Sequence, residues 1–324
     1  MSGDMNPIIE QISRIGIVPV IALEDAKDAA PLAQALQGGG IGCAEVTFRT
    51  KAAQEAIRVM TKECPEMLVG AGTVLNAQQV DQAVEAGAKF IVSHGLNPAT
   101  VSYCVEKKIP VLPGTANPSD IEAALSLGLD TVKFFPAEAA GGIKMIKAMS
   151  APYGNVKFMP TGGINADNLK EYLDFEKVIA CGGSWMVKKD LIKAGKFEEI
   201  EALAREAVNK MLGYELMHIG INSADEKEAE RTAELFGRAF GFGGRDGASS
   251  IFAGDQIEIM KAMGRGSKGH IGIGTNYIDR AVYHLEKQGI ALDHSSEKRD
   301  EKGKLKLIYL KEEIGGFGVH LIQK

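Results

Sequence analysis

The chain has 324 residues, which is enough for about two domains with sizeable cores. Its hydrophobic content of 45%, charged content of 24% and formal net charge of −5 are typical of a soluble globular protein. These values give no support to nucleic-acid or membrane-surface binding, and no apolar run approaches the roughly 20 residues that span a bilayer.

From residue 8 to about 190, helical patterns that end near glycine alternate with short apolar strands. The predicted strands end near residues 21, 47, 72, 93, 113, 134, 161 and 182, with 20 to 27 residues between neighbours. Strands that alternate with helices indicate parallel βα units, and eight such units form a (β/α)8 barrel. A doubly wound open sheet is the alternative, but the first strand ends in VPVIALED without a glycine-rich dinucleotide turn. The pattern therefore favours the barrel.

Polar residues stand at the ends of the predicted strands, where a barrel carries its active site. They are Glu45, Thr47, Arg49, Thr73, Ser93, His94, Thr115, Lys133, Thr161 and Ser184. Lys133 is unusual because it lies inside the apolar run TVKFFPAE. A strand-end lysine often keeps its ammonium group in water, but burial would lower the pKa of the amine and let it form a Schiff base with a ketone.

Two glycine pairs follow the last two predicted strands, in PTGGIN (Gly162, Gly163) and in CGGSWM (Gly182, Gly183). The loops after these strands are the usual phosphate-binding place of the fold. Glycine lets backbone N–H groups approach a phosphate closely, although glycines also serve merely to make tight turns. Two pairs on adjacent strands favour a phosphate site.

The stretches EVTFRT, VGAGTVLN, KFFPAE, PTGGI and GGSW occur in this order. Residues 8–212 closely resemble the 2-keto-3-deoxy-6-phosphogluconate (KDPG) aldolase family, which also includes 4-hydroxy-2-oxoglutarate (KHG) aldolases. The resemblance implies Schiff-base chemistry that needs no metal or other cofactor. It assigns the Schiff base to Lys133, proton transfer to Glu45 and the pyruvyl carboxylate contact to Arg49.

The same resemblance assigns the remaining substrate contacts. Thr73 matches a residue of the pyruvate region, and Thr161 matches a hydroxyl associated with stereochemical control. Gly162, Gly163 and Ser184 match the phosphate pocket. The substrate implied is a phosphorylated keto acid, and the assembly implied is a homotrimer.

The chain departs from the family at one loop. It has VSHG where ISPG is common, which places His94 in the position of a proline. His94 either contacts substrate or is a tolerated substitution in the loop.

A helical segment over residues 197–212 ends at Gly213, and we expect domains at 1–213 and 214–324. The second part contains HIGI twice, each time followed by a helical pattern and then by apolar strands. Two βαβββ halves are expected. They resemble the vicinal oxygen chelate superfamily of glyoxalase I and bleomycin-resistance proteins.

That second resemblance implies one ligand from the first and one from the last strand of each half. The matching residues are His218, Glu258, His270 and His320, with His320 where glutamate is usual. Imidazole and carboxylate groups suit a divalent zinc, nickel, iron or manganese ion. A metal-free descendant that serves packing or small-molecule binding is the alternative.

The four cysteines, at positions 43, 64, 104 and 181, form no C-x-x-C pair. Reduced, buried thiols are therefore expected, in a cytoplasmic protein. The leading functional hypothesis is reversible cleavage of KDPG to pyruvate and glyceraldehyde 3-phosphate. Cleavage of 4-hydroxy-2-oxoglutarate to pyruvate and glyoxylate is an enzymatic alternative, and an inactive phosphosugar-sensing module is a non-enzymatic one.

Overall fold

A computed structural model describes residues 5–324 of the chain. The chain divides into two compact units, Met1–Met211 and Leu212–Lys324, which are described separately below. This division falls two residues before the boundary expected after residue 213. Among the described residues, no helix is both long and apolar enough to cross a membrane.

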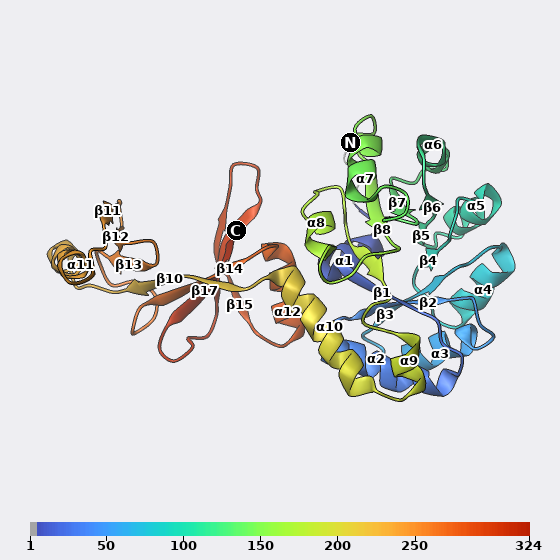
Figure 1. The fold of residues 1–324 in the computed structure, drawn as a ribbon, viewed down its shortest axis with the longest axis horizontal. Coiled ribbons are helices and arrows are strands. Elements are labelled where there is room, and N and C mark those ends of the chain that lie inside the picture. The colour runs from blue at the N-terminus through green and yellow to red at the C-terminus, as the bar shows by residue number, and fades with distance from the viewer. Residues whose placement is uncertain (1–4) are drawn as a thin grey trace. The chain divides into compact units, whose positions relative to one another are not determined.

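The N-terminal unit is a parallel barrel surrounded by helices (Figure 1). Its strands are β1 (Ile17–Ile21), β2 (Cys43–Thr47), β3 (Leu68–Gly72), β4 (Ile91–Val92), β5 (Val111–Leu112), β6 (Gly114–Thr115), β7 (Thr131–Phe134), β8 (Lys157–Pro160) and β9 (Cys181–Gly183). They form two parallel sheets, β5-β4-β3-β2-β1-β9 and β6-β7-β8. Parallel bridges from Phe158 to Val178 and from Thr161 to Gly182 join β8 to the β9 side.

The fifth predicted strand is interrupted, and this corrects the sequence-based expectation. Pro113 separates β5 from β6, because proline has no N–H to donate to a strand ladder. Its carbonyl still accepts a hydrogen bond from the backbone N–H of Lys133, at 2.9 Å. The break therefore leaves β7, the strand of Lys133, attached to the rest of the barrel.

Helices connect the strands in the predicted alternation. They are α1 (Pro7–Ile15), the short 3₁₀ helix η1 (Ala26–Asp28), α2 (Ala29–Gly38), α3 (Ala53–Glu63), α4 (Ala77–Glu85), α5 (Pro98–Glu106), α6 (Pro118–Ser126), α7 (Gly142–Ser150), α8 (Leu169–Leu173), α9 (Lys189–Lys193) and α10 (Phe197–Leu212). Three begin with an Asn-Pro pair, where the asparagine side chain caps the helix and proline takes the first helical position. These starts fix where the preceding loops end.

The C-terminal unit contains the order β-α-β-β-β twice. The first module has β10 (Glu215–Ile221), α11 (Glu226–Phe240), β11 (Gly244–Asp246), β12 (Ser250–Ala253) and β13 (Ile257–Met260). The second has β14 (His270–Thr275), α12 (Ile278–Lys287), β15 (Leu292–Arg299), β16 (Leu305–Leu310) and β17 (Gly318–Gln323). All eight strands share one sheet, β11-β12-β13-β10-β14-β17-β16-β15, in which the first strands of the two modules pair antiparallel.

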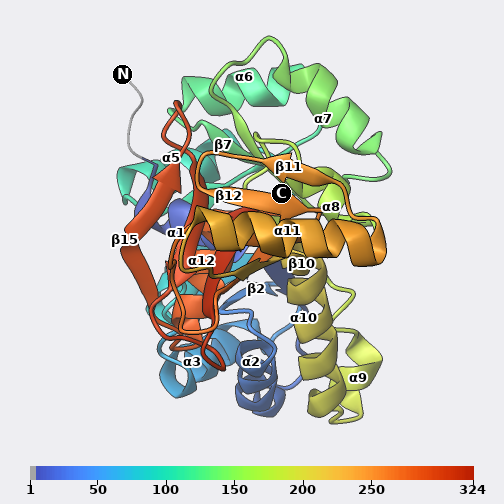
Figure 2. The same cartoon turned by 90° about the vertical axis from the view of Figure 1, so that its left-hand side faces the viewer.

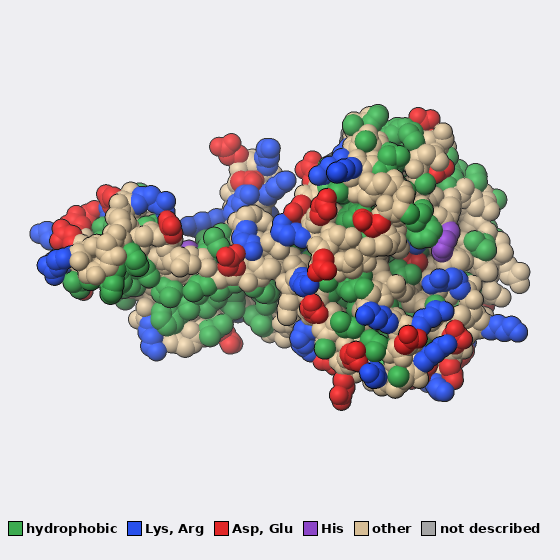
Figure 3. Space-filling view, in the orientation of Figure 1, with side chains coloured by type: hydrophobic (Ala, Val, Ile, Leu, Met, Phe, Trp, Pro, Cys, Tyr) green, Lys and Arg blue, Asp and Glu red, His purple; other side chains and the backbone are tan. Residues whose placement is uncertain are grey.

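Helices α11 and α12 pack on one face of this sheet. Helix α11 covers β12 and β13, where Ala229 packs against Ile251, Ala253 and Ile259 (Figure 2). Helix α12 contacts β16 and β17. Between them the strands β10 and β14 carry isoleucines that are only half buried. Figure 3 shows hydrophobic side chains gathered on the surface of this unit. Because side chains alternate along a strand, the histidines of HIGI lie on the opposite face.

Candidate active site

The structure brings Lys133 and Glu45 together inside the barrel. Lys133 lies on β7 and Glu45 on β2, and their side chains are 2% and 0% exposed. The Lys133 Nζ atom is 3.4 Å from Glu45 Oε1 and 5.4 Å from the ring centre of Phe135. An amine held between a carboxylate and an aromatic face, away from water, can exchange a proton with that carboxylate. The snorkelling alternative for Lys133 is therefore wrong.

The position of Glu45 depends on a glycine of the neighbouring strand. Glu45 pairs in register with Gly70 of β3, and its side chain leans over Gly72. A Cβ atom at position 72 would overlap Glu45 Oε1. The glycine therefore makes the space that the carboxylate occupies.

Arg49 stands at the rim, beyond the end of β2. Its side chain is exposed, and its Nε donates to Thr47 Oγ1 at 3.1 Å. Thr47 in turn donates from Oγ1 to the carbonyl of Ile21 at 2.7 Å, which ties the loop to β1. Within residues 5–324 no carboxylate pairs with Arg49, so its guanidinium is available for an anionic ligand.

Buried polar atoms without a hydrogen-bond partner concentrate around the barrel mouth. In the described part of the chain they include Glu45 Oε2, Thr73 Oγ1, His94 Nδ1, Thr161 Oγ1 and Trp185 Nε1. Such atoms are rare in folded proteins because each costs about 1–3 kcal/mol of desolvation. Their convergence from five strand ends marks a place where a polar ligand would satisfy them.

Thr73 also has a strained backbone, with φ at 57°. A β-branched residue in the left-handed region is an outlier, and such outliers cluster at functional sites. This strain is a feature that sequence reasoning did not identify.

The sequence interpretation also missed Trp185. Its ring lies over Gly183, where a Cβ atom would overlap it, and this brings the indole Nε1 into the group of unpartnered atoms. The only signal available was that this is the single tryptophan of the chain, next to Ser184 in GGSW. The side chain of Ser184 is exposed.

The predicted phosphate loops meet on one side of the mouth. Gly162 and Gly163 have φ values of 102° and 83°, a conformation that other residues rarely adopt. Gly182 faces Thr161 so closely that a Cβ atom there would overlap Thr161 Oγ1. The end of β8 is thus packed against β9 at Thr161 and Gly182, and the side chain of Ser184, directly after β9, is exposed.

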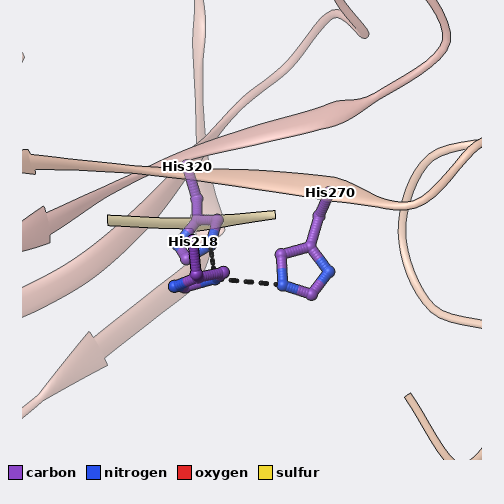
Figure 4. A group of neighbouring side chains, drawn as sticks. All are labelled: His218, His270 and His320. Atoms are coloured by element: carbon purple, nitrogen blue, oxygen red, sulfur yellow. Dashed lines mark hydrogen bonds between the residues drawn. The ribbon is translucent and has the colours of Figure 1, made fainter. Parts of the chain in front are cut away.

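A separate cluster lies in the C-terminal unit. The side chains of His218, His270 and His320 converge from β10, β14 and β17 (Figure 4). The Nε2 atom of His218 is 3.1 Å from that of His270 and 3.2 Å from that of His320. Glu258 on β13 joins them, with Oε2 at 3.0 Å from His270 Nε2 and 3.3 Å from His218 Nε2.

The repeated HIGI motif explains how the rings fit. In the antiparallel pair β10–β14, His218 lies opposite Gly272 and His270 lies opposite Gly220. A Cβ atom at either glycine would overlap the facing imidazole ring. The glycine of each motif therefore makes room for the histidine of the other.

The environment of the cluster favours groups that can donate lone pairs. Burial is the largest cause that lowers the pKa of His218 and takes that of His320 to about 3, which keeps both imidazoles neutral. The hydrogen bond from His270 lowers the pKa of Glu258 to about 2. Ser250 Oγ donates to Glu258 Oε1 at 2.7 Å, which leaves Oε2 toward the histidines, and Tyr309 stacks on His320.

The four cysteines at 43, 64, 104 and 181 are buried thiols that form no disulfide among the described residues. Burial raises the pKa of Cys43 and Cys104, in the latter case to about 11. These thiols therefore belong to the barrel core and take no part in the mouth.

A parallel (β/α)8 barrel with a buried amine at its mouth defines an enzyme of the aldolase class. The model of the KDPG and KHG aldolase family matches residues 8–203, and the chain therefore belongs to that family. A 2-dehydro-3-deoxy-phosphogluconate aldolase of Treponema pallidum is 49% identical over 204 residues, which are 63% of this chain and 97% of that protein.

Two solved structures are similar as well. The KDPG aldolase of Zymomonas mobilis with 3-phosphoglycerate has 46% identity and a TM-score of 0.58, over 61% of this chain and 94% of the other. The KDPG aldolase of Legionella pneumophila, with pyruvate captured as a covalent carbinolamine, has 40% identity and a TM-score of 0.60, over 61% of this chain and 97% of the other. The family and the barrel expected from the motifs are thereby confirmed.

Proposed function

We propose that the barrel, as a domain of residues 1–213, reversibly cleaves KDPG to pyruvate and glyceraldehyde 3-phosphate through a Schiff base on Lys133. The observation that carries the proposal is the buried pair of Lys133 Nζ and Glu45 Oε1 at 3.4 Å. Relatives named as aldolases for this substrate support it. The reaction needs no metal, because the protonated imine itself accepts the electrons of the broken bond.

The first stage consumes the amine. Lys133 gives a proton to Glu45, and the neutral Nζ attacks the C2 carbonyl carbon to form a carbinolamine. Glu45 returns a proton to the carbinolamine oxygen, water leaves, and a protonated imine remains. Glu45 is suited to both transfers because it is the carboxylate beside Nζ and has no water-exposed surface.

The second stage breaks the bond between C3 and C4. The carboxylate of Glu45 takes the proton of the C4 hydroxyl as glyceraldehyde 3-phosphate leaves, and the electron pair moves into an enamine. Protonation at C3 and hydrolysis of the imine then release pyruvate and restore Lys133. Arg49 holds the pyruvyl carboxylate, with Thr73 beside it, and this fixes the plane of the imine.

The phosphate end of the substrate is assigned to the loops after β8 and β9. Gly162, Gly163 and Ser184 would hold the phosphoryl group, and the unpartnered Thr161 hydroxyl would contact the substrate between the two ends. Cleavage of 4-hydroxy-2-oxoglutarate uses the same lysine chemistry and is a second candidate substrate. The intact Lys133, Glu45 and Arg49 argue against an inactive sensing module.

Borohydride reduction in the presence of pyruvate tests the proposal. A stable mass increase should appear on the peptide that contains Lys133, and the Lys133→Met variant should neither trap pyruvate nor cleave KDPG. Label on another lysine, or turnover in Lys133→Met, would refute the assignment. Light scattering of the same preparation tests the trimer that we propose from the family resemblance.

For residues 214–324 we propose a vicinal oxygen chelate-like domain that holds a divalent metal with His218, Glu258, His270 and His320. The spacing of the donors supports this: ligand atoms at about 2.0–2.1 Å from a tetrahedral ion lie about 3.3–3.4 Å apart. Four of the six donor pairs have separations of 3.0–3.3 Å, close to that value, and the ligand atoms of the three histidines all lie within 4.8 Å of one another. A bound metal would polarise an oxygen ligand as a Lewis acid. Elemental analysis of protein purified without chelator or affinity tag tests the site.

A further inference from the structure

His94 lies near the charged groups of Lys133, Glu45 and Arg49. It has no role in the Schiff-base steps or in the phosphate site proposed above. Its ring contacts Phe135 edge-on, with centroids 4.8 Å apart. Lys133 Nζ lies over the same phenyl ring, 5.4 Å from its centre. The imidazole and the reactive amine therefore share one aromatic platform at the mouth of the barrel.

The backbone around His94 is held tightly in place. Ser93 Oγ donates to the carbonyl of Gly95 at 2.8 Å, which closes the turn on itself. The carbonyl of His94 lies so close to Gly114 that a Cβ atom there would overlap it. Gly114 is the register partner of Lys133 in the pair β6–β7. The backbone of His94 is thus held against β6, the strand that pairs with the strand of Lys133.

The ring itself has an unused hydrogen-bonding atom. His94 is half buried, and its Nδ1 atom is buried and has no hydrogen-bond partner among residues 5–324. Burial and the nearby charge of Lys133 lower the pKa of this histidine. The imidazole is therefore neutral near neutral pH, and one of its ring nitrogens carries a proton that can be donated.

We propose that His94 is a substrate-contacting residue of the aldolase, which donates a hydrogen bond from Nδ1 to an oxygen of the bound pyruvyl group. This inference rests on the Schiff base proposed for Lys133. A pyruvyl group attached to Nζ lies beside the same phenyl ring, within the group of unpartnered atoms to which His94 Nδ1 belongs. The contact is one of binding and orientation, and no proton is transferred by His94.

Three variants separate this contact from a packing role. His94→Phe keeps a ring against Phe135 but removes the donor. His94→Asn places an amide nitrogen near the position of Nδ1, whereas His94→Gln places it near that of Nε2. His294→Phe is the matched control, because His294 is an exposed histidine of the other unit.

The readouts are KM and kcat for KDPG and the half-saturating pyruvate concentration in borohydride trapping. Loss of one hydrogen bond to a charged ligand should raise KM and the trapping concentration about 5- to 30-fold in His94→Phe and His94→Gln, with a smaller change in kcat. His94→Asn should restore both to within about threefold of wild type. His294→Phe should match wild type.

Two results would overturn the inference. One is a His94→Phe enzyme whose KM and trapping concentration lie within twofold of wild type. The other is equal impairment of the Phe, Asn and Gln variants together with a lowered unfolding temperature, which would identify a packing role. If wild-type Lys133 fails to trap pyruvate, the Schiff-base proposal itself is wrong, and this outcome is distinct from both.

Discussion

Lys133 and Glu45 are 88 residues apart in the chain, yet their Nζ and Oε1 atoms lie 3.4 Å apart inside the barrel. Both side chains are almost fully excluded from water. Isolated charges are costly to bury, so each group depends on the other for its place. Breaking this pair should therefore affect catalysis more than any change at the surface.

Replacement of Glu45 by glutamine should lower kcat for KDPG cleavage by about 10²- to 10⁴-fold, because the amide cannot accept and return a proton. The enzyme should remain folded, since the substitution keeps the volume of the side chain. Steady-state pyruvate release measures kcat, and thermal unfolding checks the fold. A Glu45→Gln enzyme within a factor of two of wild type would remove Glu45 from the mechanism.

Replacement of Arg49 by alanine should act mainly on KM. The exposed guanidinium has no carboxylate partner among residues 5–324, and its proposed role is to bind the substrate carboxylate. Loss of a charged hydrogen-bonded contact should raise KM for KDPG by about 10- to 100-fold. Arg49→Lys keeps the positive charge but lacks the planar guanidinium group, so its KM for KDPG should lie between those of wild type and Arg49→Ala. An unchanged KM in Arg49→Ala would contradict the assignment.

Gly72→Ala tests the space that Glu45 occupies. The new methyl group would overlap Glu45 Oε1 and push the carboxylate away from Lys133. A displacement of about 1 Å can cost about 10²-fold in rate, and we expect a loss of that order in kcat. Gly42→Ala is the matched control, because a Cβ atom there meets nothing within 4 Å. Equal activity of the two variants would show that Glu45 does not need this position.

Gly163→Val tests the phosphate loop. The valine would meet the side chain of Glu138 and would strain a backbone at φ 83°. We expect a raised KM for KDPG, while the pyruvate concentration needed for borohydride trapping stays the same. Gly195→Val is the control, because it carries similar backbone strain, at φ 65°, away from the mouth, and should leave the KM for KDPG unchanged.

Crystals soaked in phosphate provide an independent check of that loop. The anion should bind near Gly162, Gly163 and Ser184. An anion bound elsewhere, together with an unchanged KM in Gly163→Val, would contradict the assignment of the phosphate site to these loops.

The metal proposal predicts a bound ion that is independent of aldolase activity. Chelators should remove metal from the C-terminal unit and leave pyruvate release unchanged. Gly272→Ala should lower the metal content without altering a ligand, because the methyl group would displace the ring of His218. Gly243→Ala is the control, since a Cβ atom there meets nothing within 4 Å.

One outcome of the elemental analysis would contradict the metal proposal. If no ion is bound after supplementation with zinc, nickel, iron and manganese, the cluster of three histidines and Glu258 does not hold a metal. The C-terminal unit would then be a structural or metal-free binding domain.

Most of the barrel elements, and the chemistry that they carry, could be predicted from the amino-acid sequence, although the break at Pro113 was not. Apolar runs at intervals of 20 to 27 residues indicated the barrel strands, because burial on a parallel barrel requires continuous apolar segments. The position of Lys133 within such a run indicated a buried amine. The repeated HIGI indicated two related modules, because its histidines and glycines recur in the same local pattern.

Which side chains contact one another could not be predicted in this way, because it depends on the folded arrangement of the strands. The space that Gly72 leaves for Glu45, and the space that Gly220 and Gly272 leave for the opposite histidines, depend on strand register. The unpartnered nitrogens of His94 and Trp185 depend on loops from different strand ends. A sequence pattern reports neighbours along the chain, whereas these contacts arise from closure of the sheet, which brings together side chains that no local periodicity connects.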